Sequence, residues 1–130
     1  MVFSPQREVH ELDKSLVVDG EDVVLRRIVG TVHQVMVDVV CRAFVRRYQA
    51  QELTDMIIQG DSHVIISPTQ IIDAQWPGGQ PIHASDATLD HRVPRKNDKL
   101  VVQGKVRNIE TAEPIYIANE LVRIEMTVRG

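Results

Sequence analysis

Two histidines and two aspartates in the segment IHASDATLDH are the residues whose types could hold a metal ion. They are His83, Asp86, Asp90 and His91. Imidazole and carboxylate groups are ligands of zinc and similar ions. These four residues follow a Trp-Pro-Gly-Gly turn, however, and no rigid spacing places them on one face of a helix or strand. The polarity of an ordinary surface loop therefore explains them better than a metal site.

Two other arrangements that could support catalysis fail on their spacing. Asp61, Ser62 and His63 are adjacent, but neighbouring side chains on a strand point to opposite faces and cannot converge as a triad. Gly78 and Gly79 are followed by Gln and Pro, where a phosphate-binding loop needs Lys and a helix. We therefore expect no enzymatic activity and no cofactor, and a metal-dependent hydrolase ranks last among the functions considered.

A run of basic residues near the C-terminal end is the strongest remaining chemical signal. Its members are Arg92, Arg95, Lys96, Lys99, Lys105 and Arg107. Such side chains contact phosphates without reading bases. A solvated rim in which Lys and Arg protect strand edges explains the run at least as well. No aromatic residue is interleaved to stack on single-stranded bases, so the predicted contact is with DNA in a channel or with an acidic protein neighbour.

The charges are unevenly distributed along the chain. The formal net charge of -3 argues against a general nucleic-acid binder. The charged residues within 1–22 are mainly acidic, whereas those within 92–107 are basic except for Asp98. Two solvated faces are the usual explanation, and the same asymmetry suits a protein that docks between charged neighbours.

The single cysteine, Cys41, excludes an internal disulfide and fits a reducing compartment. Cys41 falls on the apolar side of a predicted strand, and His33 lies beside core positions, so both are interpreted as structural. No apolar run approaches the ~20 residues of a membrane helix. The N-terminus also lacks the apolar core of a signal peptide, so neither membrane insertion nor secretion is expected.

The apolar pattern predicts a single, mainly β domain over residues 1–130, either a small antiparallel barrel or a sandwich. The chain is 43% hydrophobic but only 4% aromatic, so Val and Ile must build the core. Strict alternation places Val35, Val37, Val39, Cys41, Ala43 and Val45 on one side of a long strand. Further strands are expected at residues 23–29, 63–67 and 122–129, with a hairpin of residues 100–110 that turns at Gln103-Gly104.

Short helices and one long loop complete the expected domain. Ser4-Pro5 predicts the start of an N-terminal helix that ends at Asp19-Gly20, so residues 1–22 form a helix or an acidic arm. Further short helices are expected within residues 49–60 and 69–74. Residues 75–98 are rich in Pro and Gly, which predicts a long mobile loop.

Read in order, five segments give the chain a family resemblance. They are GEDVVLRR, RAFVRRYQAQEL, IIQGDSHVIISPTQI, PRKNDKLVVQGKVRNIE and ELVRIEMTVRG. This succession resembles the head-tail joining (connector or stopper) proteins of tailed bacteriophages, over about residues 20–130. The likeness lies in strands and turns rather than in catalytic residues. The long segment WPGGQPIHASDATLDHRV departs from the usual compactness of such proteins.

The resemblance implies a structural virion protein that forms a homo-oligomeric ring in the neck. Its partners would be the portal or an adaptor protein on one side, a tail or tail-terminator protein on the other, and packaged DNA in the channel. It would pass through the host cytoplasm during assembly and contact no membrane. Adaptor, stopper and tail terminator all fit this description. The alternative function is a stand-alone OB-like or SH3-like barrel that binds nucleic acid.

Overall fold

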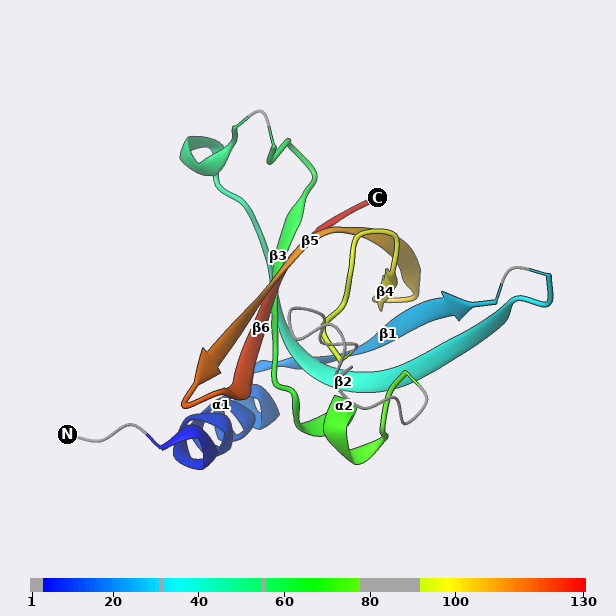
Figure 1. Cartoon of the computed structure of the whole chain (residues 1–130). Coiled ribbons are helices and arrows are strands. Elements are labelled where there is room, and N and C mark those ends of the chain that lie inside the picture. The colour runs from blue at the N-terminus through cyan, green and yellow to red at the C-terminus, as the bar shows by residue number, and fades with distance from the viewer. Residues whose placement is uncertain (1–3, 31, 55, 78–91) are drawn as a thin grey trace.

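Six strands of the described chain form a closed antiparallel barrel (Figure 1). The computed structural model describes residues 4–30, 32–54, 56–77 and 92–130. The strands are β1 (Glu21–Val29), β2 (Val35–Arg47), β3 (Ser62–Ile66), β4 (Lys99–Val102), β5 (Lys105–Ile117) and β6 (Glu120–Arg129). They follow the order β1-β2-β3-β6-β5-β4 around the barrel, and β4 pairs with β1 to close it. The predicted mainly β fold is confirmed, as a barrel rather than a sandwich.

Aliphatic side chains from all six strands fill the barrel. The alternation predicted for the long strand is confirmed where β2 crosses the barrel, because Val39, Cys41 and Ala43 are buried. Val35, predicted on the same inward side, is 59% exposed. Its end of β2 extends past the barrel, so the side chain has no core to enter.

The β5–β6 hairpin is longer than the sequence pattern predicts. Its two-residue turn places Ala118 and Asn119 at φ values of 50° and 65°, as a type I′ turn requires. The pairing register shifts between Ile115 and Tyr116. Close to this shift, Leu121 belongs to the barrel core, whereas Val122 does not, although strict alternation predicts the reverse. The predicted β4–β5 turn at Gln103-Gly104 is confirmed.

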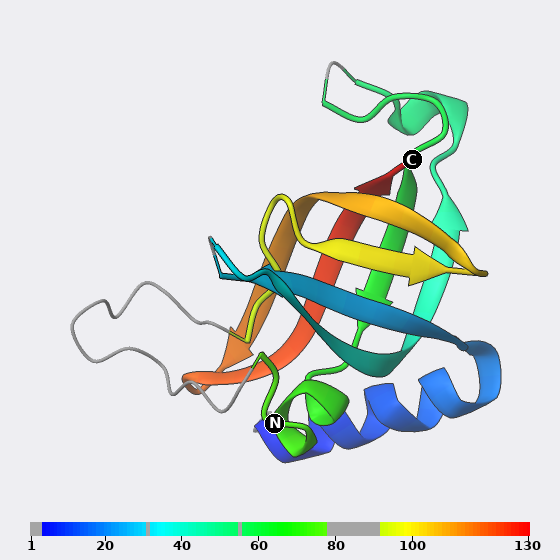
Figure 2. The same ribbon diagram turned by 90° about the vertical axis from the view of Figure 1, so that its right-hand side faces the viewer.

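The N-terminal helix α1 (Pro5–Asp19) lies across one end of the barrel (Figure 2). It begins as predicted, since the Ser4 hydroxyl accepts the N–H of Arg7 at 3.4 Å. Leu12 and Leu16 are its buried residues. The helix ends as predicted at Gly20, where the backbone becomes extended, and a Cβ at this position would lie only 2.5 Å from the carbonyl oxygen of Leu16.

Arg42 of β2 holds the C-terminal end of α1. Its guanidinium donates to the carbonyl oxygens of Leu16 at 3.2 Å, Val17 at 3.2 Å and Gly20 at 2.7 Å. The Leu16 carbonyl also accepts the backbone N–H of Gly20 at 2.9 Å, and a cation at this end of the helix opposes the negative end of the helix dipole. Arg42 therefore lies on the outward face of β2 and attaches α1 to the barrel.

The helix expected within residues 49–60 is mostly absent from the described part of that segment. Only a three-residue 3-10 turn, η1 (Ala50–Glu52), forms there. The Glu52 carboxylate accepts the backbone N–H of Gln49 at 2.9 Å. The Thr54 hydroxyl then accepts the N–H groups of Met56 and Ile57, which satisfies them in a turn rather than in a helix.

The predicted long loop is packed against the barrel at both ends. The short helix α2 (Thr69–Asp73) precedes it. Pro68 is the N-cap of α2, and the Ser67 hydroxyl accepts the N–H of Thr69. Trp76 is 3% exposed and Val93 is 9% exposed, and both join the core. Residues 75–77 and 92–98 are thus docked rather than free. The remainder of the loop, residues 78–91, lies outside the described residues.

A buried ion pair between Arg27 and Asp98 joins this loop to the barrel. Arg27 is the inward-facing residue after Leu25 in β1, and its Nη2 lies 2.8 Å from the Asp98 carboxylate. The same nitrogen donates to the carbonyl oxygen of Val93 at 3.2 Å, and the guanidinium stacks 4.5 Å from the centre of the Trp76 ring. Asp98 also accepts the backbone N–H of Arg95 at 2.9 Å. Each charge is thereby paired and hydrogen-bonded, as burial requires.

The buried pair yields a matched test with its exposed neighbour. Arg27→Met leaves the Asp98 carboxylate buried without its cation and should lower the free energy of unfolding by about 3–5 kcal/mol. Arg26→Met removes an exposed pair with Asp38 and should change it little. Urea denaturation followed by circular dichroism measures both.

The double variant Arg27→Met with Asp98→Leu separates charge from packing. It should recover part of the loss, because no unpaired buried charge remains. Equal losses for Arg26→Met and Arg27→Met would contradict the role given to the pair.

Candidate functional site

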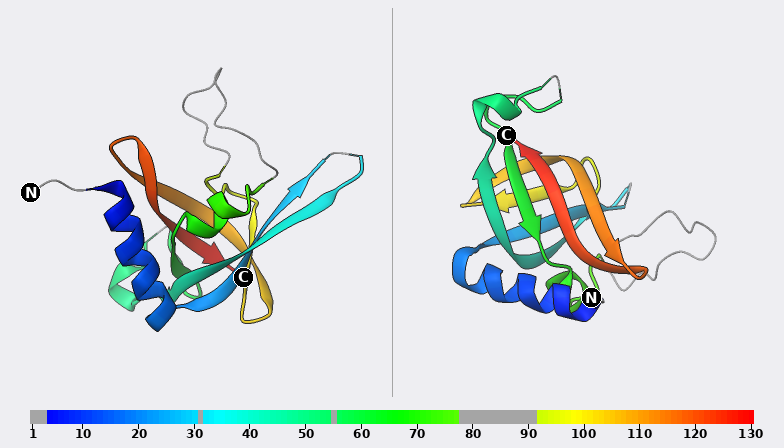
Figure 3. Two further views of the ribbon diagram at one scale, coloured as in Figure 1. Left: turned by 90° about the horizontal axis from the view of Figure 1, so that it is seen from below. Right: turned by 90° about the vertical axis from the view of Figure 1, so that its left-hand side faces the viewer.

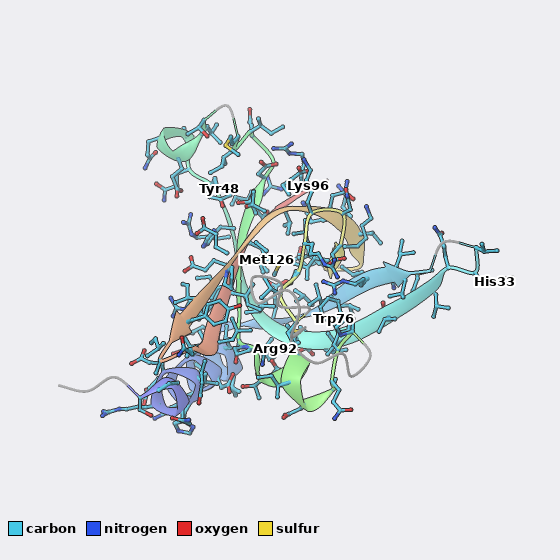
Figure 4. The ribbon with its side chains drawn as sticks, in the orientation of Figure 1. His33, Tyr48, Trp76, Arg92, Lys96 and Met126 are labelled. Atoms are coloured by element: carbon cyan, nitrogen blue, oxygen red, sulfur yellow. The ribbon has the colours of Figure 1, made fainter. Side chains whose placement is uncertain are left out.

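The structure distributes the six predicted basic residues over separate parts of the barrel. In Figure 4, Arg92 and Trp76 are labelled in the same part of the barrel, whereas Lys96 lies apart from them in that view. Lys96 is exposed, and its Nζ is 4.0 Å from a carboxylate oxygen of Glu110. Arg95 is also exposed, next to the Asp98 that its backbone N–H contacts. These three basic residues belong to one segment but not to one compact patch.

Strand register separates the other three basic residues. Directly opposite residues of an antiparallel pair share a face. Lys99 is opposite Asn108 and hydrogen-bonds its side chain, whereas Arg107 is opposite the core residue Leu100. Lys105 lies on the same face of β5 as Arg107 and is exposed at the end of the barrel. The predicted contacts with DNA or an acidic neighbour remain a prediction for these residues, now as individual positions.

A polar network that the sequence does not predict lies on the outer face of β3 and β6. His63 Nδ1 is 3.0 Å from the Tyr48 hydroxyl, and its Nε2 is 3.0 Å from a carboxylate oxygen of Glu125. The Tyr48 hydroxyl is also 2.7 Å from the hydroxyl of Thr127. An ionised carboxylate only accepts, so Nε2 donates to Glu125 and Nδ1 of the neutral ring accepts from Tyr48. Every polar atom of the imidazole is satisfied.

A pocket of about 350 Å³ lies over this network. Its lining includes Tyr48, His63, Glu125 and Thr127, together with Thr54, Met56, Ile57, Thr111, Glu113 and Met126. Glu113 and Glu125 are paired across β5 and β6, so their carboxylates share one face. This arrangement favours hydrogen-bond donors over anions. The Tyr48 hydroxyl, the His63 ring and the Glu125 carboxylate are hydrogen-bonded in sequence, and the Tyr48 hydroxyl is bonded to Thr127 as well.

Asp61 fixes the segment that forms one wall of the pocket. Its side chain is fully buried, and its carboxylate accepts hydrogen bonds from Arg129 Nε at 2.8 Å and Nη2 at 2.9 Å. The Asp61 carboxylate also accepts the backbone N–H of Ile58, and Arg129 donates to the carbonyl oxygen of Met56. Hydrogen bonds from the Arg129 guanidinium hold the pKa of Asp61 below its ordinary value. Asp61 is therefore a structural anchor and not part of a triad.

The β1–β2 hairpin extends well beyond the barrel (Figure 3). Strand β4 pairs with β1 only as far as Arg26, and β3 pairs with β2 only from Ala43 onward. The half of the hairpin that is farther from the barrel is therefore a two-stranded ribbon. Ile28 lies opposite Met36, and Val29 lies opposite Val35. Because successive residues alternate between faces, both faces of this ribbon are apolar.

The exposed fractions confirm that no part of the described chain covers this ribbon. They are 46% for Ile28, 44% for Val29, 83% for Val32, 59% for Val35 and 63% for Met36. His33, predicted beside core positions, is instead exposed at the tip of the hairpin (Figure 4). That prediction is wrong because the alternating pattern continues past the point where the barrel ends.

The remaining predicted residues are Cys41 and the four possible metal ligands. Cys41 is buried as predicted, and burial raises the pKa of its thiol to about 12. His83, Asp86, Asp90 and His91 lie outside the described residues. Within the residues that are described, no group of three or more His, Cys, Asp and Glu side chains could hold a metal ion.

No protein-family model matches the chain, and no curated protein matches its sequence. Of the helices in the described ranges, none has the length and apolar character needed to cross a membrane.

The Asp61 anchor should make stability depend on pH in a defined direction. A carboxylate whose pKa is lowered by folding stabilises the protein above its unfolded pKa, and this contribution is lost as pH falls through the folded pKa. Asp61→Asn should therefore be less stable than the native chain at pH 7, and the difference should shrink below the ordinary value of 3.8. Urea unfolding of both proteins over this range measures the difference.

Asp73→Asn, at an exposed aspartate of α2, is the matched control and should follow the native chain throughout. A deficit in Asp61→Asn that stayed constant down to the lowest pH would show that the lost anchor is not electrostatic.

Proposed function

We propose that the chain is a structural subunit of a homo-oligomeric ring in the neck of a tailed bacteriophage or prophage, with the portal or an adaptor on one side and the tail on the other. It acts by contact and has neither catalytic activity nor a cofactor. The observation that carries this proposal is the β1–β2 ribbon, which is exposed and apolar on both faces. The family resemblance of the sequence supplies the setting.

A ribbon of this kind favours assembly for a physical reason. Two-stranded ribbons are marginal in water on their own, and exposed apolar surface of this extent marks a contact site. One partner surface would bury one face and leave the other wet. A ring buries both faces, because each protruding element can lie between its neighbours.

The distribution of charge supports the neck over the alternative of a stand-alone nucleic-acid-binding barrel. A barrel that binds nucleic acid by itself needs a continuous basic surface to neutralise phosphates. Here the net charge is -3, and Lys99 and Arg107 lie on different faces of the β4–β5 hairpin. Contact with DNA in a channel requires less from each copy, because many copies act together.

The proposal predicts a loss of joining when the ribbon becomes polar. Met36→Ser should leave the fold and melting temperature unchanged, because Met36 is 63% exposed, but should reduce the joining of heads to tails at least tenfold. Met56→Ser, at a methionine that is 73% exposed elsewhere, is the matched control and should join normally. The assay adds each purified protein to heads and tails from particles that lack it and counts complete virions by electron microscopy.

Particles made with the native protein should carry it at the neck. Its absence there, or equal activity of the two methionine variants, would contradict the proposal.

The isolated chain should bind duplex DNA weakly, with little dependence on salt. If it is instead an independent DNA binder, affinity should be high and fall steeply with salt, because each phosphate contact releases counterions. Changing Arg92, Arg95, Lys96 and Lys99 together to Gln should then abolish that binding. Fluorescence anisotropy at low and at physiological salt distinguishes the two functions.

A further inference from the structure

We infer that the tip of the β1–β2 hairpin inserts into a groove between α1 and α2 of a second copy of the chain. This contact rests on the proposed function, since it is the link from one ring subunit to the next. It is head-to-tail, because tip and groove are different surfaces. The argument depends on the shape of the groove, on one buried oxygen within it, and on the direction of the hairpin.

The groove has a volume of about 310 Å³ and a mixed lining. Its apolar residues are Pro5, Val9, Pro68, Ile72 and Leu121, and its polar residues are Gln6, His10, Asp13, Thr69 and Glu120. Ile72 is 46% exposed, so apolar surface is left uncovered at its edge. A short, mainly aliphatic segment that also brings hydrogen-bond donors would suit both parts of this lining.

Asp13 supplies the polar requirement. Its Oδ2 accepts from the Thr69 hydroxyl at 2.6 Å, but its Oδ1 is buried and has no hydrogen-bond partner among the described residues. A buried carboxylate oxygen without a donor is destabilising, and such atoms generally have a partner in the functional state of a protein. Glu120 adds a second acidic group, with Gln6 donating to it at 3.2 Å. The groove therefore lacks a donor rather than another acceptor.

The hairpin tip carries the complementary groups. Val32 is 83% exposed, and the exposed His33 beside it has a ring N–H that can donate. From Val29 to Val37 the sequence contains no Asp or Glu, so no acidic side chain opposes entry into a groove lined by Asp13 and Glu120. The aliphatic side chains of the tip can pack against Ile72 and Val9, and the imidazole can donate a hydrogen bond to Asp13 Oδ1.

The two surfaces cannot meet within one molecule. The hairpin points away from α1 in Figure 1 and again in the left view of Figure 3. Its base is fixed, because the indole N–H of Trp76 donates to the carbonyl oxygen of Val37 at 2.9 Å. Insertion must therefore occur between copies. Repetition of one heterologous contact produces a closed ring or an open filament.

Disulfide trapping between single-cysteine additions tests the contact on the full-length chain. Val32→Cys and Ile72→Cys are prepared separately, mixed at high concentration and oxidised, and the products are separated without reductant. Native Cys41 should stay inert, since it is buried and its pKa is about 12. We expect a covalent dimer from Val32→Cys with Ile72→Cys, at least tenfold more abundant than from Val32→Cys with Gln59→Cys, an exposed control position.

Three outcomes would overturn the contact: no dimer from the mixture, equal yields with Ile72→Cys and Gln59→Cys, or faster pairing of Val32→Cys with itself, which would mean tip-to-tip association. Failure here remains distinct from failure of the proposed function. A chain found at the neck without the trapped dimer refutes only the groove. A trapped dimer from a chain that is absent from virions refutes only the neck.

Discussion

The ion pair between Arg27 and Asp98 is the interaction on which closure of the barrel depends. Arg27 lies on the inward face of β1, where a charge is expensive unless it is fully paired. Its carboxylate partner immediately precedes β4, the strand that joins β1 to β5. The carbonyl oxygen of Asp98 also accepts the N–H of Ile109 in β5 at 3.0 Å. One residue therefore aligns the closing strand with both of its neighbours.

The same cluster determines where the barrel ends and the free ribbon begins. The ring of Trp76 covers the guanidinium of Arg27 in β1. Its indole N–H donates to the carbonyl oxygen of Val37, the residue of β2 that is paired with Arg27. Up to this level the β1–β2 hairpin is enclosed by the barrel and by the two ends of the long loop. One residue further along each strand, Ile28 and Met36 are exposed. The rigid base makes the ribbon a fixed projection, which lowers the entropy lost on docking.

How much the sequence predicts depends on the range of the interaction. Caps and alternation are local, so the start of α1 at Ser4, its end at Gly20 and the inward face of β2 at Cys41 are all predictable. Arg26 and Arg27 are adjacent and chemically identical, and only the register of β1 decides which one is buried. The partner of Arg27 is 71 residues away. The Tyr48–His63–Glu125 network depends likewise on the pairing of β3 with β6, which are far apart in the chain.

The exposed ribbon could not be predicted from the sequence, because the alternating pattern that predicts the strand is the same inside and outside the barrel. Alternation continues without a break from Val35 to Val45, although the barrel covers only part of that length. The barrel core is complete without the tip, since strands, α2 and Trp76 enclose it. Aliphatic residues that a core does not need are costly in solution, because they reduce solubility and add nothing to folding. Their retention on both faces of a fixed projection is best explained by a surface that encloses them, and that surface belongs to another molecule.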